Sequence, residues 1–373
     1  MNRRTDILIV GAGMAGASIA AELAPHASVT ILEAEAQAGY HSTGRSAAFW
    51  SESYGGPLVQ PLTSASGPFL AAPPPEFHER SFLSPRGAIH IADPGGAAIL
   101  EEMYGEFRGT AVEMALLDRR AIEEAIPGLK PGWEAGLAEP SCADIDVAAL
   151  HGAYLRAARA KGAVLLTDAA FEGADRLASG WRGETRAGAI QARILVDAAG
   201  AWADEVASRA GEAPLGIRPY RRTIAQLRVD PPAPAGLPLV IDAAGRFYFK
   251  PEAGGRLWLS PHDEAACEPC DCAPEEYDVA LAIDRLQRVV DWRVERVEHS
   301  WAGLRSFAPD RLPVYGFAAG RRDFFWFAGQ GGFGIQTAPA AAKLAASSLL
   351  GNAPEAMVAG IDPEPYRAER FAN

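Results

Sequence analysis

The sequence predicts an α/β protein in which a parallel sheet, assembled from separated stretches of chain, is joined to a second unit built on an antiparallel sheet. Three patterns predict this fold. An apolar run ends in a GxGxxG turn that opens a helix, a second apolar run lies at 192–199, and residues 222–261 alternate between apolar and polar. Two structural units are expected because one hydrophobic core rarely keeps growing to 373 residues.

The first unit begins with a short apolar run, Asp6 to Val10, which suits a buried parallel strand. Residues 14–23 are predicted to form a helix and residues 28–32 the next strand, so that this stretch makes one βαβ unit. The apolar run at 192–199 follows a helical stretch at 146–160. It indicates another strand of the same sheet, reached after a long excursion of the chain.

The alternating region predicts antiparallel strands with one buried face. Arg222 falls on the face opposite Leu227, and Tyr248 falls on the face opposite Phe249. A sheet whose second face carries Arg222 and Tyr248 is suited to form the wall of a polar pocket. Further along the chain, the glycine-rich loop 329–334 leads into a helix predicted at 339–350, with Thr337 as N-cap and Gly351 just past its end.

The GxGxxG turn has the context that a dinucleotide site requires. Gly11 permits the tight turn, Gly13 leaves room for a pyrophosphate, and Gly16 lets the helix and strand pack closely. The diphosphate would face the helix N-terminus, where N–H groups and the helix dipole favour negative charge. Glu33, 22 residues beyond Gly11, is placed to accept hydrogen bonds from ribose hydroxyls. This fingerprint alone does not distinguish NAD from FAD.

The composition excludes several function classes. A net charge of −12 does not supply the clustered basic residues that bind nucleic acid. No stretch of 18 apolar residues occurs, and the apolar run near the N-terminus is too short for a signal segment, so no integral membrane association is expected. We therefore expect a cytoplasmic enzyme.

Three of the four cysteines, Cys267, Cys270 and Cys272, lie close together in an acidic, proline-containing loop. One interpretation is a metal site or a redox pair. However, the CxxCxC spacing lacks a second ligand cluster or a suitably placed histidine, and Cys142 is remote in sequence. Surface thiols in a reducing compartment are the favoured interpretation, and no metal is predicted.

Several blocks together resemble a known family. They are the GxGxxG turn, the segment 39–48 (GYHSTGRSAA), the segment 197–202 (DAAGAW), the segment 300–307 (SWAGLRSF) and the loop 331–337. In this order they resemble the D-amino acid oxidase-like superfamily of FAD-dependent oxidoreductases, and within it the D-arginine dehydrogenase type. The likeness runs from residue 7 to about residue 345.

This resemblance implies a non-covalently bound FAD and an approximate set of cofactor-binding residues. The segment 42–48 would pass beside the flavin ring and the pyrophosphate, and the backbone near Ala170 would meet the adenine. The loop 331–336 would approach the pyrimidine edge, where a helix N-terminus suits the negative charge of the reduced flavin. The expected cofactor-binding residues are Gly11, Gly13, Met14, Ala15, Gly16, Glu33, Ala34, Ser42, Thr43, Gly44, Arg45, Ser46, Ala47, Ala48, Ala170, Ala199, Gly200, Trp202, Gly331, Gly332, Phe333, Gly334, Ile335, Gln336 and Thr337.

Two arginines, Arg222 and Arg305, are the candidate anchors for a substrate carboxylate, since a guanidinium holds a carboxylate in a fixed orientation. From the residues alone, an interdomain salt bridge is an equal alternative for each; the resemblance implies the carboxylate role. It also implies that Tyr54 and Tyr248 contribute hydroxyl groups. The remaining catalytic candidates, Gly303 and Gln336, rest on the resemblance alone. It implies that the Gly303 carbonyl lies beside the substrate amine and that Gln336 lies at the flavin edge.

The expected reaction is oxidative deamination of a D-amino acid. The neutral amine loses hydride from Cα to the flavin, and the imino acid is hydrolysed to a 2-oxo acid and ammonia. In arginine-preferring members, the positions of Ala88 and Phe49 hold an acidic residue and a histidine, whereas both are apolar here. We therefore expect a preference for uncharged or hydrophobic side chains. The electron acceptor is a quinone or oxygen.

Three alternatives remain open: a 2-hydroxy-acid or glycerophosphate dehydrogenase on the same fold, a non-catalytic FAD-fold binding module, and an NAD-dependent dehydrogenase. The last would leave the segments 42–48 and 331–336 unexplained. The expected domain organisation is discontinuous. Residues 1–81, 142–212 and 309–373 would form the Rossmann-like FAD-binding domain, and residues 82–141 and 213–308 an α+β substrate domain.

Overall fold

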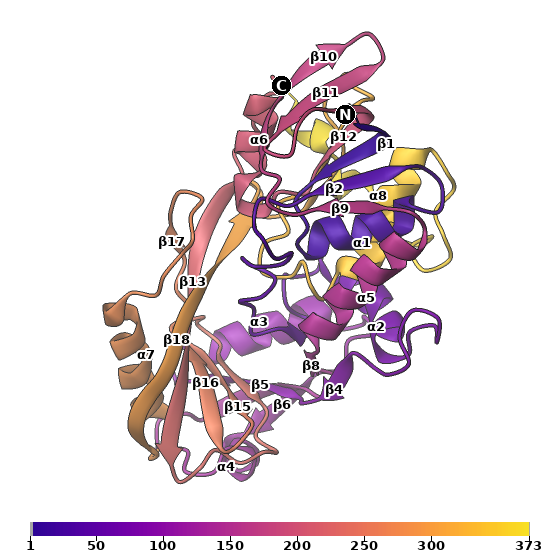
Figure 1. The fold of residues 1–373 in the computed structure, drawn as a ribbon. Coiled ribbons are helices and arrows are strands. Elements are labelled where there is room, and N and C mark those ends of the chain that lie inside the picture. Colours follow the sequence, from indigo (N-terminus) through magenta and orange to yellow (C-terminus); the bar gives the residue numbers. More distant parts are fainter. Residues whose placement is uncertain (1–2, 373) are drawn as a thin grey trace.

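The computed structural model describes residues 3–372, and two large sheets organise it (Figure 1). The first has eight strands in the order β10-β11-β12-β1-β2-β9, with β20 beside β12 and β19 beside β20. Its strands are β1 (Arg3–Val10), β2 (Val29–Leu32), β9 (Val164–Leu166), β10 (Phe171–Leu177), β11 (Gly180–Thr185), β12 (Ile190–Asp197), β19 (Val314–Phe317) and β20 (Phe324–Ala328). The pairs β1-β2, β1-β12, β2-β9 and β12-β20 are parallel.

The second sheet has nine strands and is antiparallel except where β14 lies parallel to β5. Its strands are β5 (Ala88–Ala92), β6 (Ala115–Asp118), β7 (Ala135–Glu139), β13 (Arg218–Asp230), β14 (Leu239–Asp242), β15 (Tyr248–Glu252), β16 (Arg256–Ser260), β17 (Ala265–Ala266) and β18 (Arg293–Phe307). A small third sheet of β3 (Phe49–Trp50), β4 (Leu83–Pro85) and β8 (Ala143–Ile145) completes the strands. The predicted fold class, a parallel sheet joined to an antiparallel one, is confirmed.

The helices are α1 (Met14–Leu23), α2 (Gln60–Ala71), α3 (Ala97–Phe107), α4 (Arg119–Ala125), α5 (Val147–Ala160), α6 (Ala203–Arg209), α7 (Glu276–Val289) and α8 (Ala338–Leu350), with short 3₁₀ turns η1 (Gly200–Trp202), η2 (Glu364–Tyr366) and η3 (Ala368–Phe371). Within residues 3–372, no helix is both long and apolar enough to cross a membrane. The predicted helix at 339–350 is confirmed, and Gly351 ends it in the left-handed conformation with φ of 69°. Thr337 stands at its N-cap, but its hydroxyl donates to the Phe333 carbonyl instead of capping the helix.

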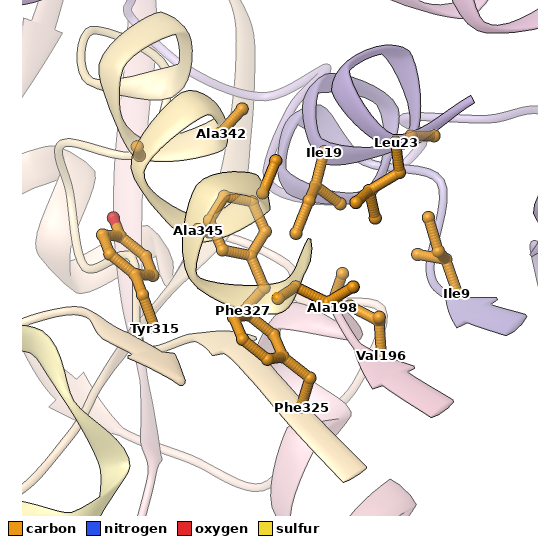
Figure 2. Packing of buried hydrophobic residues seen from close by; sticks show 14 of the residues in the cluster. Ile9, Ile19, Leu23, Val196, Ala198, Tyr315, Phe325, Phe327, Ala342 and Ala345 are labelled. Carbon is orange, nitrogen blue, oxygen red and sulfur yellow. The ribbon is translucent and has the colours of Figure 1, made fainter. Parts of the chain in front are cut away.

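Strand β1 forms the centre of the first sheet and is buried on both faces. Ile7 and Ile9 point to the side covered by α1 and α8, where Ile9 packs near Ile19 and Val196 (Figure 2). Leu8 and Val10 point to the opposite face, toward α6. This double burial explains why the strand is an uninterrupted apolar run and not an alternating one.

The two sheets are drawn from interleaved parts of the chain. The first uses residues between 3 and 32, 164 and 197, and 314 and 328, and the second uses residues between 88 and 139 and between 218 and 307. The exact predicted domain limits stay a prediction, and their residues 1–2 and 373 lie outside the described residues.

Candidate active site

The turn between β1 and α1 has the tight backbone and the close helix–strand packing that its glycines predict. Gly11 has φ of +99°, and a Cβ there would lie 2.5 Å from the Ala198 carbonyl oxygen. A Cβ on Gly16 would lie 1.8 Å from the Gly11 carbonyl oxygen, so only glycine lets the helix approach this closely. Helix α1 begins at Met14 without a side-chain cap at Gly13. The amide of Met14 donates to the Thr43 hydroxyl at 2.9 Å, and Gly13, Met14 and Ala15 line the adjoining cavity, so the helix N-terminus favours an anion there.

Glu33 follows β2 and is 8% exposed. One carboxylate oxygen accepts the amide of Ala12 at 3.1 Å, and the other accepts the amide of Glu35 at 3.0 Å. Burial raises the pKa of Glu33, although these backbone amides oppose the shift. Glu33 therefore holds the glycine turn in place, and it also lines the cavity in which ribose hydroxyls were expected.

A single cavity of about 740 Å³ extends from Glu33 and Ala170 at one end to Arg222 and Tyr248 at the other. Most of the expected cofactor-binding residues line it: Gly11, Gly13, Met14, Ala15, Glu33, Ala34, Ser42, Thr43, Arg45, Ser46, Ala47, Ala170, Ala199, Gly200, Trp202, Gly331, Gly332, Gly334 and Ile335. The cavity thus brings together segments that lie far apart in the sequence.

Six of the expected residues lie beside this cavity without lining it. Gly16 packs against the Gly11 carbonyl in the turn before α1, and Gly44 donates its amide to the Gly39 carbonyl. Phe333 is packed in an apolar cluster, and Thr337 is fully buried. The last two, Ala48 and Gln336, line a small adjoining cavity of about 20 Å³ together with Arg305.

The segment 39–48 is fastened to the antiparallel sheet. Ser42 donates its hydroxyl to the Leu304 carbonyl at 2.6 Å. Arg45 forms an ion pair with Asp271 and donates to the carbonyl oxygens of Cys272 and Ala302 at 3.0 and 3.2 Å. Arg45 therefore joins the cavity wall to the loop that follows β17, in addition to lining the cavity.

Four predicted substrate-binding side chains, Arg222, Arg305, Tyr54 and Tyr248, converge at the far end. Arg305 donates to the Tyr54 hydroxyl at 2.7 Å, and its guanidinium lies 5.7 Å from the centre of the Tyr54 ring. Arg222 donates from Nε to the Asp263 carbonyl at 2.8 Å, and its Nη2 lies 3.2 Å from Glu264. Burial, with the nearby charge of Arg305, lowers the pKa of Arg222 to about 10, so it is charged at neutral pH.

Two buried polar atoms at this end have no hydrogen-bond partner among residues 3–372: Nη1 of Arg222 and the hydroxyl of Tyr248. Arg222 is only 4% exposed and Tyr248 only 3%. Leaving such groups unpaired costs roughly 1–3 kcal/mol each, so their presence indicates a ligand that accepts from them. The alternative of a simple salt bridge does not account for the site, because Glu264 engages only one nitrogen of Arg222 and Arg305 has no ion pair in the described chain.

The other predicted residues lie around this cluster. Gly303 pairs with Arg222 in the β13-β18 register and lines the cavity. Phe49 lies with its ring centre 5.6 Å from that of Tyr54 and 6.0 Å from that of Tyr248. Ala88 is buried in the apolar cluster that includes Tyr248, and Phe49 packs against the same cluster.

Gln336 plays a structural role that the sequence did not indicate. Its amide oxygen accepts from the Ser51 amide at 3.1 Å, and its nitrogen donates to the Tyr54 carbonyl at 3.2 Å and to Thr63 at 2.9 Å. Sequence reasoning also missed Glu139, which contacts the same turn. No motif or spacing marks Glu139, because it meets its partners only through tertiary contacts.

The cysteine loop differs in part from the expectation of surface thiols. Cys270 is exposed, but Cys272 is buried and packs with Ala201 and Leu304 beside the cavity. Burial and the neighbouring thiols raise the pKa of Cys272 to about 11. The thiol is therefore protonated at neutral pH and is a weak nucleophile.

Comparison with known proteins agrees with this geometry. The family described as FAD dependent oxidoreductase (DAO) matches residues 6–348. Glycine oxidase of Geobacillus kaustophilus is 27% identical over 358 residues, covering 93% of each chain. Hydrogen cyanide synthase subunit HcnC of Pseudomonas aeruginosa is 25% identical over 362 residues, covering 85% of each chain.

Solved structures share the whole architecture. The crystal structure of glycine oxidase from Geobacillus kaustophilus has a TM-score of 0.84 at 26% identity and covers 99% of both chains. L-proline dehydrogenase from P. horikoshii has the same TM-score, 0.84, at 21% identity, with 100% of this chain and 98% of that chain covered. This second likeness concerns the fold.

Proposed function

The chain belongs to the family of FAD-dependent oxidoreductases, and from that premise we propose that it oxidises the Cα–N bond of small α-amino acids with uncharged side chains. One observation carries the proposal. The unpartnered Nη1 of Arg222 and hydroxyl of Tyr248 share a cavity with Arg305, which also donates to the Tyr54 hydroxyl, and these groups together match a carboxylate.

The cofactor prediction, FAD, is confirmed. The site fits this group, because the turn that opens α1 lines the cavity, and its close packing leaves no room for a Cβ: one at Gly11 would collide with the Ala198 carbonyl and one at Gly16 with the Gly11 carbonyl. The segment 39–48 and the loop 331–335 supply the remaining walls. When bound, FAD supplies the acceptor that takes the substrate's hydride.

The residues of this chain have a positioning task. Arg222 and Arg305 would hold the carboxylate, and the hydroxyls of Tyr54 and Tyr248 would complete its hydrogen bonds. The carbonyl of Gly303, opposite Arg222 in the sheet, would accept from the neutral amine. Such fixation places Cα for transfer and removes water from the reacting bond. Hydrolysis of the imino acid then yields the 2-oxo acid and ammonia.

The surroundings of the substrate support the choice of side chain. The residues expected to face it, Phe49 and Ala88, are apolar, and neither would offer a counter-charge to a cationic substrate. A lysine-like or arginine-like side chain would therefore be desolvated without compensation. We place D-amino acids with uncharged side chains first, and glycine and N-methylated glycines second, since the relatives include glycine oxidase and dimethylglycine dehydrogenase.

The test is anaerobic addition of single compounds to the purified holoenzyme while the oxidised-flavin absorption band is followed. The panel contains D-leucine, D-phenylalanine, D-arginine, glycine, N-methylglycine and a set of 2-hydroxy acids. We expect bleaching by uncharged amino acids and little by D-arginine. Faster bleaching by D-arginine than by D-leucine would contradict the side-chain preference, and bleaching by 2-hydroxy acids alone would favour a hydroxy-acid dehydrogenase.

Several narrower points stay predictions: the D-arginine dehydrogenase type within the family, the cytoplasmic location, the non-covalent attachment of FAD and the use of a quinone or oxygen as electron acceptor. Repeating the reduction and then admitting air tests the acceptor directly. Rapid return of the flavin band in air identifies an oxidase, and a slow return that a quinone accelerates identifies a dehydrogenase.

A further inference from the structure

The turn Ser51–Tyr54 follows β3 and carries one of the four side chains that converge at the substrate end of the cavity. It is held from two directions. Gln336, just before α8, bonds the amide of Ser51 and the carbonyl of Tyr54. On the other side, the carboxylate of Glu139 at the end of β7 contacts the same turn. The position of Tyr54 therefore depends on both sheets.

Glu139 is fully buried, with an exposed fraction of 0%. Its two carboxylate oxygens accept three hydrogen bonds from three consecutive residues. These bonds come from the Ser51 hydroxyl at 2.9 Å, the Glu52 amide at 2.6 Å and the Ser53 hydroxyl at 2.5 Å. A single carboxylate thus fixes the backbone and both serine side chains of the turn.

This carboxylate has no counter-charge. Glu139 forms no ion pair with any residue in the range 3–372, and burial raises its pKa while the three donors oppose the shift. A buried carboxyl group without an ion pair is costly, so a plain apolar residue would serve the packing better. What Glu139 adds is a set of acceptors matched to one turn.

The turn leads directly into the carboxylate-binding cluster. The Tyr54 hydroxyl accepts from Arg305 Nη1 at 2.7 Å. There is little room for it to lie elsewhere, because a Cβ on Gly332 would come within 2.0 Å of that hydroxyl. The position of the turn therefore sets how closely Tyr54 approaches Arg305.

We propose that Glu139 is a positioning residue for substrate binding: through Ser51, Ser53 and the Glu52 amide it holds Tyr54 against Arg305, and so shapes the carboxylate site. The proposal rests on the proposed function and extends it to a residue outside the cavity. It assigns Glu139 no contact with substrate or FAD.

The test compares E139L, E139Q and S53A in the FAD-loaded enzyme. E139L removes every acceptor, whereas the amide of E139Q can still accept from Glu52 and donate to the serine hydroxyls. The readouts are the Kd of acetate, measured by perturbation of the flavin spectrum, and the KM and kcat for the best amino acid. We expect E139L to raise both the acetate Kd and KM by about tenfold to hundredfold. In E139Q, the acetate Kd and KM should change by about threefold or less, and kcat at saturating substrate should change equally little. S53A should give values of Kd and KM between those of E139Q and E139L.

The matched control is D242N, which alters another buried carboxylate of the same sheet that is paired with Arg246 outside the site. We expect it to lower Tm and leave the acetate Kd unchanged. Folded, FAD-loaded E139L and S53A that bind acetate as tightly as the unmodified enzyme would overturn the proposal, as would an equal loss in D242N.

Failure of the proposed function would look different, because the unmodified enzyme would then neither bind acetate nor be reduced by any amino acid. In that case, crystal structures of the unmodified and E139L proteins decide the role of Glu139. Loss of the Tyr54–Arg305 contact in E139L supports the positioning role, and its retention overturns it.

Discussion

At the scale of single residues, the site is defined by two arginines whose hydrogen-bonding groups the described residues pair only in part. Arg305 contacts Tyr54 but no carboxylate of the described chain, and Arg222 keeps one nitrogen unpartnered. The charge of Arg305 contributes to lowering the pKa of Arg222, and two guanidinium groups this close repel unless an anion joins them. We propose that the substrate carboxylate is this anion.

Replacing Arg305 with methionine should lower kcat/KM by about 100-fold, since a charge-assisted hydrogen bond contributes about 1.5–3 kcal/mol. The loss should fall mainly on KM, because the carboxylate keeps its charge throughout the reaction. Steady-state kinetics of R305M measure this. R293M is the control, since the Arg293 side chain is 69% exposed and its only ion pairs within residues 3–372 are with Asp230 and Glu295. An unchanged KM in R305M would show that Arg305 does not bind the substrate carboxylate.

Asp197 predicts a pH dependence of stability. It is fully buried at the end of β12, one of its oxygens has no partner in the described chain, and burial raises its pKa well above the usual 3.8. Between pH 3.8 and the folded-state pKa, only the folded protein holds this proton. Stability must therefore fall with rising pH in this window, by up to about 1.4 kcal/mol per pH unit.

D197N should remove this part of the pH dependence, because asparagine carries no ionisable proton. Thermal unfolding of both proteins between pH 4 and pH 9 measures it. The Tm of D197N relative to the unmodified protein should be lowest near pH 4 and should rise steadily as the pH increases. Parallel curves across the range would show that Asp197 does not retain its proton on folding.

At the scale of elements, glycine-rich turns bring backbone and side chains closer than any other residue would allow. The loop between β20 and α8 illustrates this at Gly332, where a Cβ would lie 2.0 Å from the Tyr54 hydroxyl and 3.1 Å from the Arg305 guanidinium carbon. The loop was predicted to serve the cofactor. The structure shows that it also confines the two residues expected to bind substrate.

G332A should therefore weaken substrate binding while FAD is retained. We expect KM to rise at least tenfold as Tyr54 and Arg305 are pushed apart, with an unchanged ratio of bound flavin to protein. G105A is the control, because Gly105 lies in α3 with open space around it, and alanine there should stabilise by about 0.5–1 kcal/mol. A normal KM in G332A would show that the loop shifts to accommodate the Cβ without displacing Tyr54 and Arg305.

At the scale of the whole molecule, one cavity collects residues from stretches of the chain that lie far apart in the sequence. It is lined by the turn before α1, the segment 39–48, Ala170, the turn η1 and the strands β13 and β18. The long strands β13 and β18 pair along most of their length and reach from the second sheet to this cavity. A ligand in the cavity therefore touches segments that the chain otherwise keeps apart.

Removal of FAD should consequently destabilise the entire protein. A ligand at 100 times its Kd that binds only the folded state stabilises it by about 2.7 kcal/mol. For a protein of this size, we expect Tm to drop by about 3 °C in the apoprotein and to return when FAD is added back. An apoprotein with the same Tm would show that bound FAD does not contribute to the stability of the folded protein.

Much of the fold could be predicted from local pattern. Strand β1, helices α1, α5 and α8 and the faces of β13 and β15 were predicted because periodicity and glycine placement act over a few residues. Alternation alone placed Arg222 and Tyr248 on the faces of their strands opposite Leu227 and Phe249. Helices α2, α3, α4, α6 and α7 were not predicted.

By itself the sequence determined the dinucleotide turn, the two kinds of sheet and, with the family resemblance, the four side chains at the substrate end. Only the tertiary structure decided that Glu139 and Gln336 hold the Tyr54 turn, that Arg45 pairs with Asp271 and that Cys272 is buried. The reason is physical. Backbone periodicity depends on neighbouring residues, whereas these hydrogen bonds and this ion pair join residues 87 to 285 positions apart and form only once both sheets have packed around the same cavity.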